Sequence, residues 1–126
     1  MANAQIGTYQ MVQTITADPP RLVLMLFDGA ERFLLQARRA LLAGDIGRYC
    51  DSVARAHAVI VELSTTLDRD AGGEIAETLS QLYGFMLRHL TQGLIEKSVT
   101  HIDEVLGPLR EIREGFEGAV EVHGRE

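Results

Sequence analysis

Tryptophan is absent from this sequence of 126 residues, cysteine occurs once and proline only three times. The single cysteine, Cys50, excludes a disulfide within the chain, as is typical of proteins from a reducing compartment. Aromatic residues make up only 6% of the sequence, so a buried core has to be mostly aliphatic. Alternating β-branched stretches are also few. Together these absences favour helices over strands.

Long apolar runs and a basic surplus are missing as well. No run approaches the roughly 20 residues that span a bilayer, so we expect no stable membrane insertion. The first ten residues lack the basic start and apolar core of a secretory signal. The 12 basic and 18 acidic residues give a formal net charge of -6, which argues against nucleic acid or anionic lipid as a partner. We therefore expect a cytoplasmic protein.

Hydrophobic residues make up 46% of the chain and charged residues 24%, the balance of one globular domain. Apolar spacing predicts four helices, at about residues 20–43, 46–67, 74–94 and 99–116. Their short connections fit an all-α fold, an antiparallel four-helix bundle. We expect the domains to be a short N-terminal arm or helix (1–17), the bundle (18–118) and a frayed polar tail (119–126).

Several residues predict where these helices begin, end or bend. Asp18 and Asp45 are suited to cap the first and second helices, and Gly44 to end the first. The glycine pair after Asp68 predicts a loop over residues 68–73. Pro108 predicts a bend in the last helix, because proline inside a helix costs about 3 kcal/mol or more.

The first helix opens with six consecutive apolar residues, Leu22 to Phe27. Each residue turns a helix by about 100°, so the six point to every side and one bundle core can cover only some of them. We expect Met25 and Met86 to be core fillers, although methionine also suits binding surfaces. Gly29 follows, where glycine costs about 1 kcal/mol against alanine. It either lets a neighbouring helix pack closely or offers a flat place to a partner.

No pattern in the sequence predicts catalysis, a cofactor or a metal. The Glu-x-x-His pairs of di-iron bundles are absent, and the nearest approach is His101 with Glu104 in reversed order. Cys50 lies near a helix start, which can lower a thiol pKa, but a structural role is favoured. The Gly72-Gly73 pair is interpreted as a tight turn and not as an anion site. The four histidines are interpreted as scattered and solvated: His57, His89, His101 and His123.

Three segments resemble the flagellin export chaperone family, a cytoplasmic component of bacterial flagellar assembly. The first is the helix opening from Pro20 to Leu34, with the run L-V-L-M-L-F-D-G-A. The second joins L-D at 67–68 to G-G-E-I-A at 72–76 and L-Y at 82–83. The third spans 103–114, D-E-V-L-G and L-R-E-I-R-E around Pro108. The segments follow in the family's order over about residues 5–116.

This resemblance implies an antiparallel bundle that binds the C-terminal segment of flagellin and prevents its premature polymerisation. It further implies that the chaperone helps deliver flagellin to the export gate of the flagellar type III apparatus. The client segment is disordered alone and folds into helices on the chaperone, while a displaceable N-terminal arm lies over the same region. The partner-binding residues implied by the resemblance and by the opening helix are Ile6, Tyr9, Leu22, Leu26, Asp28, Gly29 and Tyr83.

The sequence departs from the family pattern at three positions. Pro20 follows another proline. Pro108 stands where a helix former is expected, and Glu31 stands where an apolar residue is common. Two other classes stay open at this point. One is a bundle that serves only weak self-association as a homo-oligomer or binds a different flagellar partner. The other is a helical enzyme or metal carrier, against which the missing ligand spacing argues.

Overall fold

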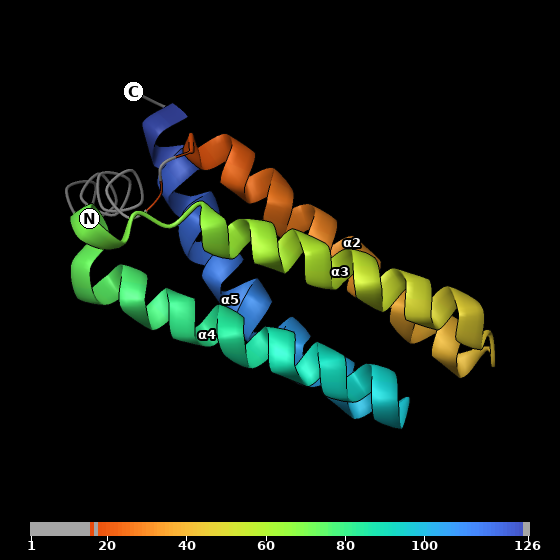
Figure 1. The fold of residues 1–126 in the computed structure, drawn as a ribbon. Helices are drawn as coiled ribbons and strands as arrows, with labels where there is room; N and C mark the ends of the chain where they lie inside the picture. Colours follow the sequence, from red (N-terminus) through yellow and green to blue (C-terminus); the bar gives the residue numbers. More distant parts are fainter. Residues whose placement is uncertain (1–15, 17, 125–126) are drawn as a thin grey trace.

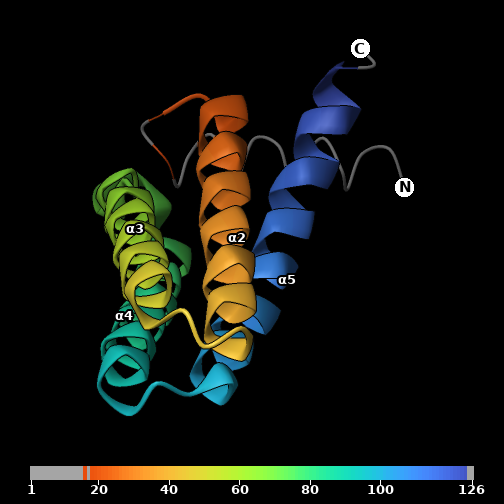
Figure 2. The same ribbon diagram turned by 90° about the vertical axis from the view of Figure 1, so that its right-hand side faces the viewer.

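A computed structural model describes Thr16 and residues 18–124, with side chains through Gly118. This part of the chain forms four helices, α2 (Pro20–Leu42), α3 (Ile46–Thr65), α4 (Arg69–Glu96) and α5 (Val99–Gly124). The helices run up and down along one long axis, each beside the next in sequence, and α5 returns to lie beside α2 (Figures 1 and 2). The predicted all-α four-helix bundle is confirmed.

Ion pairs along the α2–α5 seam show the antiparallel register of these two helices. Arg38 pairs with Asp103 at 3.0 Å, close to the end of α2 and the start of α5. Arg110 pairs with Glu31, also at 3.0 Å, closer to the middle of both helices. Because the residue numbers fall along α2 as they rise along α5, the two helices run in opposite directions.

The core is built mainly from aliphatic side chains, as the scarcity of aromatic residues predicted. Phe27 lies at its centre, with its ring 5.2 Å from that of Phe116 and 6.4 Å from that of Tyr83. Met86 is fully buried, which confirms its predicted role as a core filler. Each such side chain contributes about 1.5–3 kcal/mol through burial. The largest fully buried side chains are Tyr49, Tyr83, Phe27, Leu34, Ile60, Leu63, Met86, Leu90, Ile102, Leu109, Val23 and Val53.

The junctions of α2 and α3 confirm two predicted helix signals and contradict one. Asp45 caps α3, since its carboxylate accepts the backbone N–H of Arg48 at 3.1 Å. Gly44 has φ +77°, a left-handed conformation that glycine adopts readily after a helix. Asp18 does not cap α2, because Pro19 occupies the N-cap position and no side chain supplies a cap hydrogen bond.

The loop predicted over residues 68–73 is mostly helical. Asp68 caps α4 by accepting the N–H of Ala71 at 3.0 Å, so that the helix begins at Arg69. Gly73 nevertheless interrupts it, with φ 54° and ψ -132°. A residue without Cβ adopts such angles at little cost. The glycine pair therefore marks a break within the helix and not a loop before it.

The last helix is longer than its apolar stripe predicted. α5 continues through Pro108 and ends at Gly124 instead of near Phe116, so residues 119–124 of the predicted frayed tail are helical. Arg113 and Glu117, four residues apart, pair at 2.6 Å and support this stretch. No proline follows Pro108 to stop the hydrogen-bond ladder. Across the described residues, none of the helices combines the length and apolarity needed to cross a membrane.

Candidate partner-binding surface

The six apolar residues at the start of α2 are divided between the core and the surface. Val23 and Phe27 are 1% and 0% exposed. Leu22 and Met25 are 52% and 66% exposed, and Leu26 is half-buried at the edge of the core. The bundle thus covers only part of the run, as the sequence predicted. Met25 is a surface residue, so its interpretation as a core filler was wrong.

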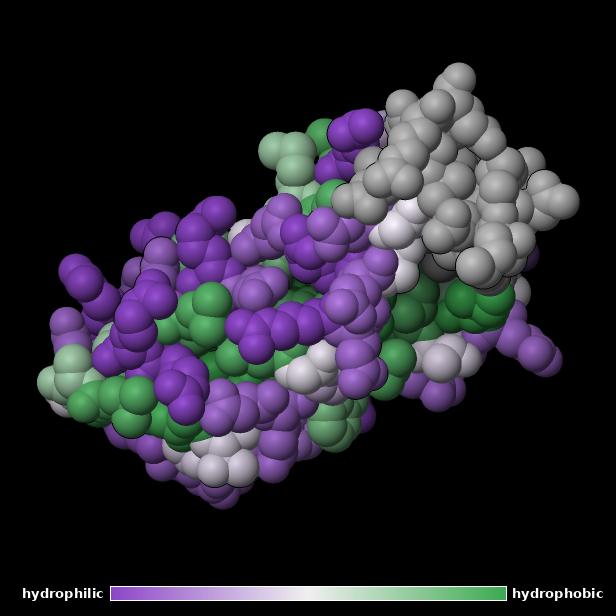
Figure 3. Space-filling view, turned by 180° about the vertical axis from the view of Figure 1, so that it is seen from behind, coloured by the Kyte–Doolittle hydropathy of each residue, from purple (hydrophilic) through white to green (hydrophobic). Residues whose placement is uncertain are grey.

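Leu22, Met25 and Leu26 form one continuous apolar strip, here called the α2 patch. They are three and four residues apart, the spacing of neighbours on a helix surface. Apolar side chains also reach the surface elsewhere: the face opposite to that of Figure 1 shows apolar stretches between charged groups along the bundle (Figure 3). Exposed apolar surface of this kind, bordered by polar groups, is typical of interaction sites.

Gly29 lies one turn after Met25, and its surroundings decide between its two interpretations. A Cβ built on Gly29 would meet only Nη2 of Arg32 within 4 Å, at 3.9 Å. No neighbouring helix approaches as closely, so the interpretation of tight helix packing was wrong. Gly29 is itself buried, with the Arg32 side chain lying beside it, so the flat place for a partner stays a prediction.

Asp28 already has a partner within the chain. Its carboxylate accepts a hydrogen bond at 2.5 Å from Nε of Arg113, which also pairs with Glu117. The hydrogen bond that Arg113 donates to Asp28 is the main reason that the pKa of Arg113 is raised. Glu31, where the resembled family often has an apolar residue, pairs with Arg110 in the same seam. Each such partly exposed pair contributes about 0–1 kcal/mol to the free energy of unfolding. The pairs therefore add little stability, and their main effect is to fix the register between α2 and α5.

Tyr83 is a core residue. It is 1% exposed, its ring packs near that of Phe27, and burial raises the pKa of its hydroxyl. In this structure it offers almost no surface to a partner, and its role in partner binding stays a prediction.

The end of the N-terminal arm is attached at the junction of α3 and α4. Thr16 is 4% exposed, and its hydroxyl donates to the carbonyl of Thr66 at 3.2 Å. Its backbone forms an isolated antiparallel bridge with Leu67. The other two predicted contact residues, Ile6 and Tyr9, lie outside the described residues.

A groove with a volume of about 680 Å³ lies between α2 and α3, near the turn that joins them. Phe33 and Ala40 supply apolar walls, and none of the lining residues is histidine or cysteine. Charges of both signs line the rest of it: Arg39, Arg48, Arg55, Asp45 and Asp51.

The structure does bring together two histidines that the sequence interpretation had treated as scattered. His89 of α4 and His101 of α5 lie beside Glu104 of α5, and both histidines are half-buried. Sequence spacing had paired only His101 with Glu104, because His89 comes from a different helix and joins them through tertiary packing. Met25 was also missed as a surface residue, although its place in the run from Leu22 to Phe27 could have indicated it.

A helical bundle with an exposed apolar patch and a mixed-charge groove defines a protein of the all-α class that is suited to binding another chain. Comparison with known proteins agrees: the family described as "Flagellar protein FliS" matches residues 1–123. The chain belongs to this family, which is a family of chaperones and not of enzymes.

Relatives from distant bacteria cover most of the chain. It is 38% identical over 116 residues to the flagellar secretion chaperone FliS of Salmonella typhimurium, covering 91% of this chain and 84% of the relative. The chaperone of the same name from Campylobacter jejuni is 32% identical over 124 residues, with coverage of 98% and 94%. That from Bacillus subtilis is 30% identical over 113 residues, with coverage of 90% and 84%.

Proposed function

We propose that this protein is a cytoplasmic export chaperone that binds the C-terminal segment of flagellin. In this role it prevents early polymerisation of flagellin and helps deliver it to an export gate component of the flagellar type III apparatus. The observation that carries the proposal is the family match over residues 1–123, supported by relatives that are named flagellar secretion chaperones. Flagellin and the gate enter through the resemblance of the three sequence segments.

The α2 patch supplies the physical means for such binding. An amphipathic client helix can lay its apolar face against exposed apolar side chains between helices. Ordering a client that is disordered alone costs roughly 2–5 kcal/mol. Burial of exposed side chains such as Leu22 and Met25 offsets that cost at about 25 cal/mol per Å² of apolar surface.

The arm is proposed to shield this patch in the absence of client. Thr16 ties the end of the arm to Leu67, beside the junction of α3 and α4. From this anchor the residues before it, including Ile6 and Tyr9, are proposed to cover apolar surface and limit self-association. The client would then displace the arm, and release would follow from competition or handover.

Charge substitutions in the α2 patch test the proposal directly. Leu22→Glu and Leu26→Glu should each weaken binding of a flagellin C-terminal peptide at least tenfold, because a carboxylate would be desolvated in the apolar contact. The measurement is isothermal titration of the peptide into each variant. Leu42→Glu is the matched control, since Leu42 is a leucine of the same helix, 66% exposed at its other end.

Unchanged peptide affinity in both patch variants would move the client site away from the start of α2. Equal weakening by Leu42→Glu would show that added negative charge, and not the patch, is responsible. Circular dichroism on each variant establishes that the helices are retained. Sedimentation with and without flagellin separates the proposed one-to-one complex from a bundle that only self-associates.

A further inference from the structure

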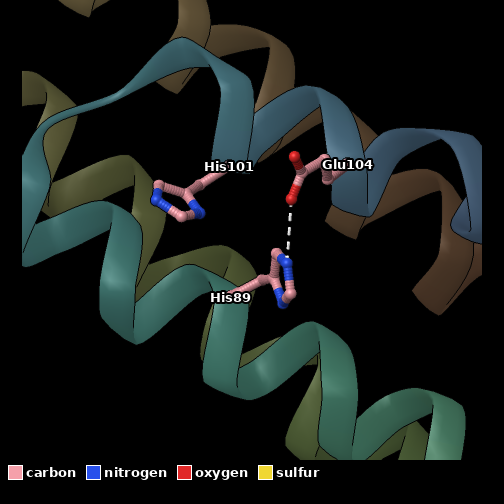
Figure 4. Close-up of side chains that lie close together, drawn as sticks. All are labelled: His89, His101 and Glu104. Carbon is pink, nitrogen blue, oxygen red and sulfur yellow. Dashed lines mark ion pairs between the residues drawn. The ribbon is translucent and has the colours of Figure 1, made fainter.

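Three side chains with metal-binding atoms converge where α4 and α5 lie side by side. His89, His101 and Glu104 each place one such atom within 4.8 Å of the others. His89 points from α4 toward Glu104, while a ring nitrogen of His101 faces the space between them (Figure 4). The Nε2 atom of His89 lies 2.8 Å from Oε2 of Glu104. This cluster is separate from the α2 patch and from the α2–α3 groove.

The second nitrogen of His89 is held in a way that leaves Nε2 as the ligand atom. Nδ1 lies 3.2 Å from the backbone carbonyl of Phe85. A carbonyl oxygen only accepts, so Nδ1 carries the hydrogen of this bond. In the neutral imidazole the lone pair then lies on Nε2, which faces Glu104. The Phe85 ring packs against the His89 ring, with centroids 4.0 Å apart, and helps to fix its orientation.

His101 is oriented by the same kind of contact, but here Nε2 makes the supporting hydrogen bond and Nδ1 is the free ligand atom. Its Nε2 lies 2.5 Å from a carboxylate oxygen of Glu96, and this hydrogen bond lowers the pKa of Glu96. An ionised carboxylate only accepts, so Nε2 carries the hydrogen and Nδ1 is left with the lone pair. Among the buried side-chain nitrogen and oxygen atoms of the described residues, this Nδ1 is the one without a hydrogen-bond partner. An unpartnered buried acceptor is uncommon in folded proteins.

These contacts match the way proteins support metal-binding histidines. A ligating imidazole usually donates its other N–H to a carboxylate or a backbone carbonyl, which fixes the tautomer and the ring. Here a carbonyl supports His89 and a carboxylate supports His101. Two imidazoles and one carboxylate suit zinc and related transition metals, whereas calcium and magnesium prefer oxygen ligands.

We propose that His89, His101 and Glu104 form a binding site for one zinc-class divalent cation that links α4 to α5. Zinc bonds of about 2.0–2.2 Å place tetrahedral ligand atoms roughly 3.4 Å apart, so small side-chain rotations would close the cluster around the ion. Without metal, a proton lies between Nε2 of His89 and Oε2 of Glu104, which are 2.8 Å apart. The ion would displace this proton, leaving the lone pair of Nε2 to bind it, and would give Nδ1 of His101 its missing partner. Water would complete the coordination.

Titration of the metal alone tests this proposal on the full-length, untagged protein after treatment with a chelator. Calorimetry with Zn²⁺ should show saturable binding of one ion per chain, and excess Zn²⁺ should raise the melting temperature, because the ion binds the folded state. Co²⁺ as a spectroscopic substitute should give the visible absorption of a low-coordinate nitrogen and oxygen site. Absence of saturable binding in the wild type would overturn the proposal.

Substitutions then assign the ligands. His89→Ala and His101→Ala should each weaken Zn²⁺ binding at least tenfold, and Glu96→Gln should weaken it to a smaller extent by loosening His101. His57→Ala is the matched control, since His57 lies on α3 outside the cluster. Unchanged affinity in both His89→Ala and His101→Ala, or equal weakening by His57→Ala, would refute the assignment. Circular dichroism without metal checks that each variant folds. If His89→Ala does not fold, His89→Gln replaces it.

Discussion

Gly93 shows how one residue can fix the distance between three helices. A Cβ built on it would lie 3.3 Å from the Tyr49 hydroxyl of α3 and 3.3 Å from Cβ of His101 of α5. Its carbonyl accepts a hydrogen bond from the Tyr49 hydroxyl at 2.6 Å and another from the N–H of Lys97 at 2.8 Å. The glycine therefore permits a close approach and anchors a buried polar contact at the same place.

We expect Gly93→Ala to destabilise the protein by roughly 1–3 kcal/mol, because the added methyl group would push against Tyr49 and His101. Gly115→Ala is the matched control on α5, where a new Cβ would meet nothing within 4 Å. That control should stabilise the helix by about 0.5–1 kcal/mol. Urea unfolding followed by circular dichroism measures both. Equal stabilisation by the two substitutions would contradict the close approach at Gly93.

Asp28 and Tyr83 show contacts within the chain that residue identity alone does not reveal. Both lie in segments that resemble the chaperone family, and both were expected to contact a partner. In the structure the Asp28 carboxylate is bound by Arg113, and Tyr83 is enclosed beside Phe27. Sequence could not reveal this, because Arg113 lies 85 positions from Asp28 and is brought close only by the return of α5.

At the scale of the element, α5 carries a proline that the helix accommodates. Pro108 has no N–H to donate to the carbonyl of Glu104, so one bond of the ladder is missing. The helix nevertheless continues from Val99 to Gly124. Leu106 and Leu109, on either side of Pro108, are 4% and 0% exposed. Their burial against the other helices holds α5 together across the missing bond.

Pro108→Ala should raise the free energy of unfolding by roughly 1–3 kcal/mol, because it restores a backbone hydrogen bond and removes the clash of the ring with the preceding turn. Thermal unfolding should show this as an increase of several degrees in the melting temperature. Pro19→Ala, just before α2, is the control and should have little effect, since no helical N–H is lost there. Unchanged or lower stability of Pro108→Ala would contradict this prediction. It would show that the packing of α5 depends on the local helix geometry at Pro108.

α2 shows a second element-scale property, a helix whose apolar surface exceeds what its neighbours cover. Val23 and Phe27 point into the bundle, while Leu22 and Met25 stay in contact with solvent. Six successive apolar residues made this division predictable, since they point to every side of a helix. Which of them face outward depends on the side from which α3 and α5 approach.

At the scale of the whole molecule, the bundle and the arm are separable in their contributions. All the buried core side chains of the described residues belong to α2, α3, α4 and α5. The arm meets them through Thr16, which bonds to Thr66 and bridges to Leu67. The fold of the bundle should thus not require the residues that precede Thr16.

Deletion of residues 2–15 should leave the helical circular dichroism signal and a cooperative thermal transition, because the core is untouched. In the proposed mechanism it should also strengthen binding of a flagellin C-terminal peptide by several-fold, since the client no longer competes with the arm. The contacts of Thr16 make Thr16→Ala in the full-length chain a useful control for the loss of that anchor alone. Wholesale loss of helix would contradict the separation.

The sequence by itself determined the all-α class, the approximate extent of four helices, the aliphatic core and the excess of apolar surface at the start of α2. These follow from local periodicity and capping, which act over a few neighbouring residues. Only the tertiary structure decided that Met25 faces out, that Tyr83 faces in, that Asp28 is bound by Arg113 and that His89, His101 and Glu104 meet. Each of these depends on which helix lies opposite and in what register, and the return of α4 and α5 sets that register through contacts between residues far apart in the chain.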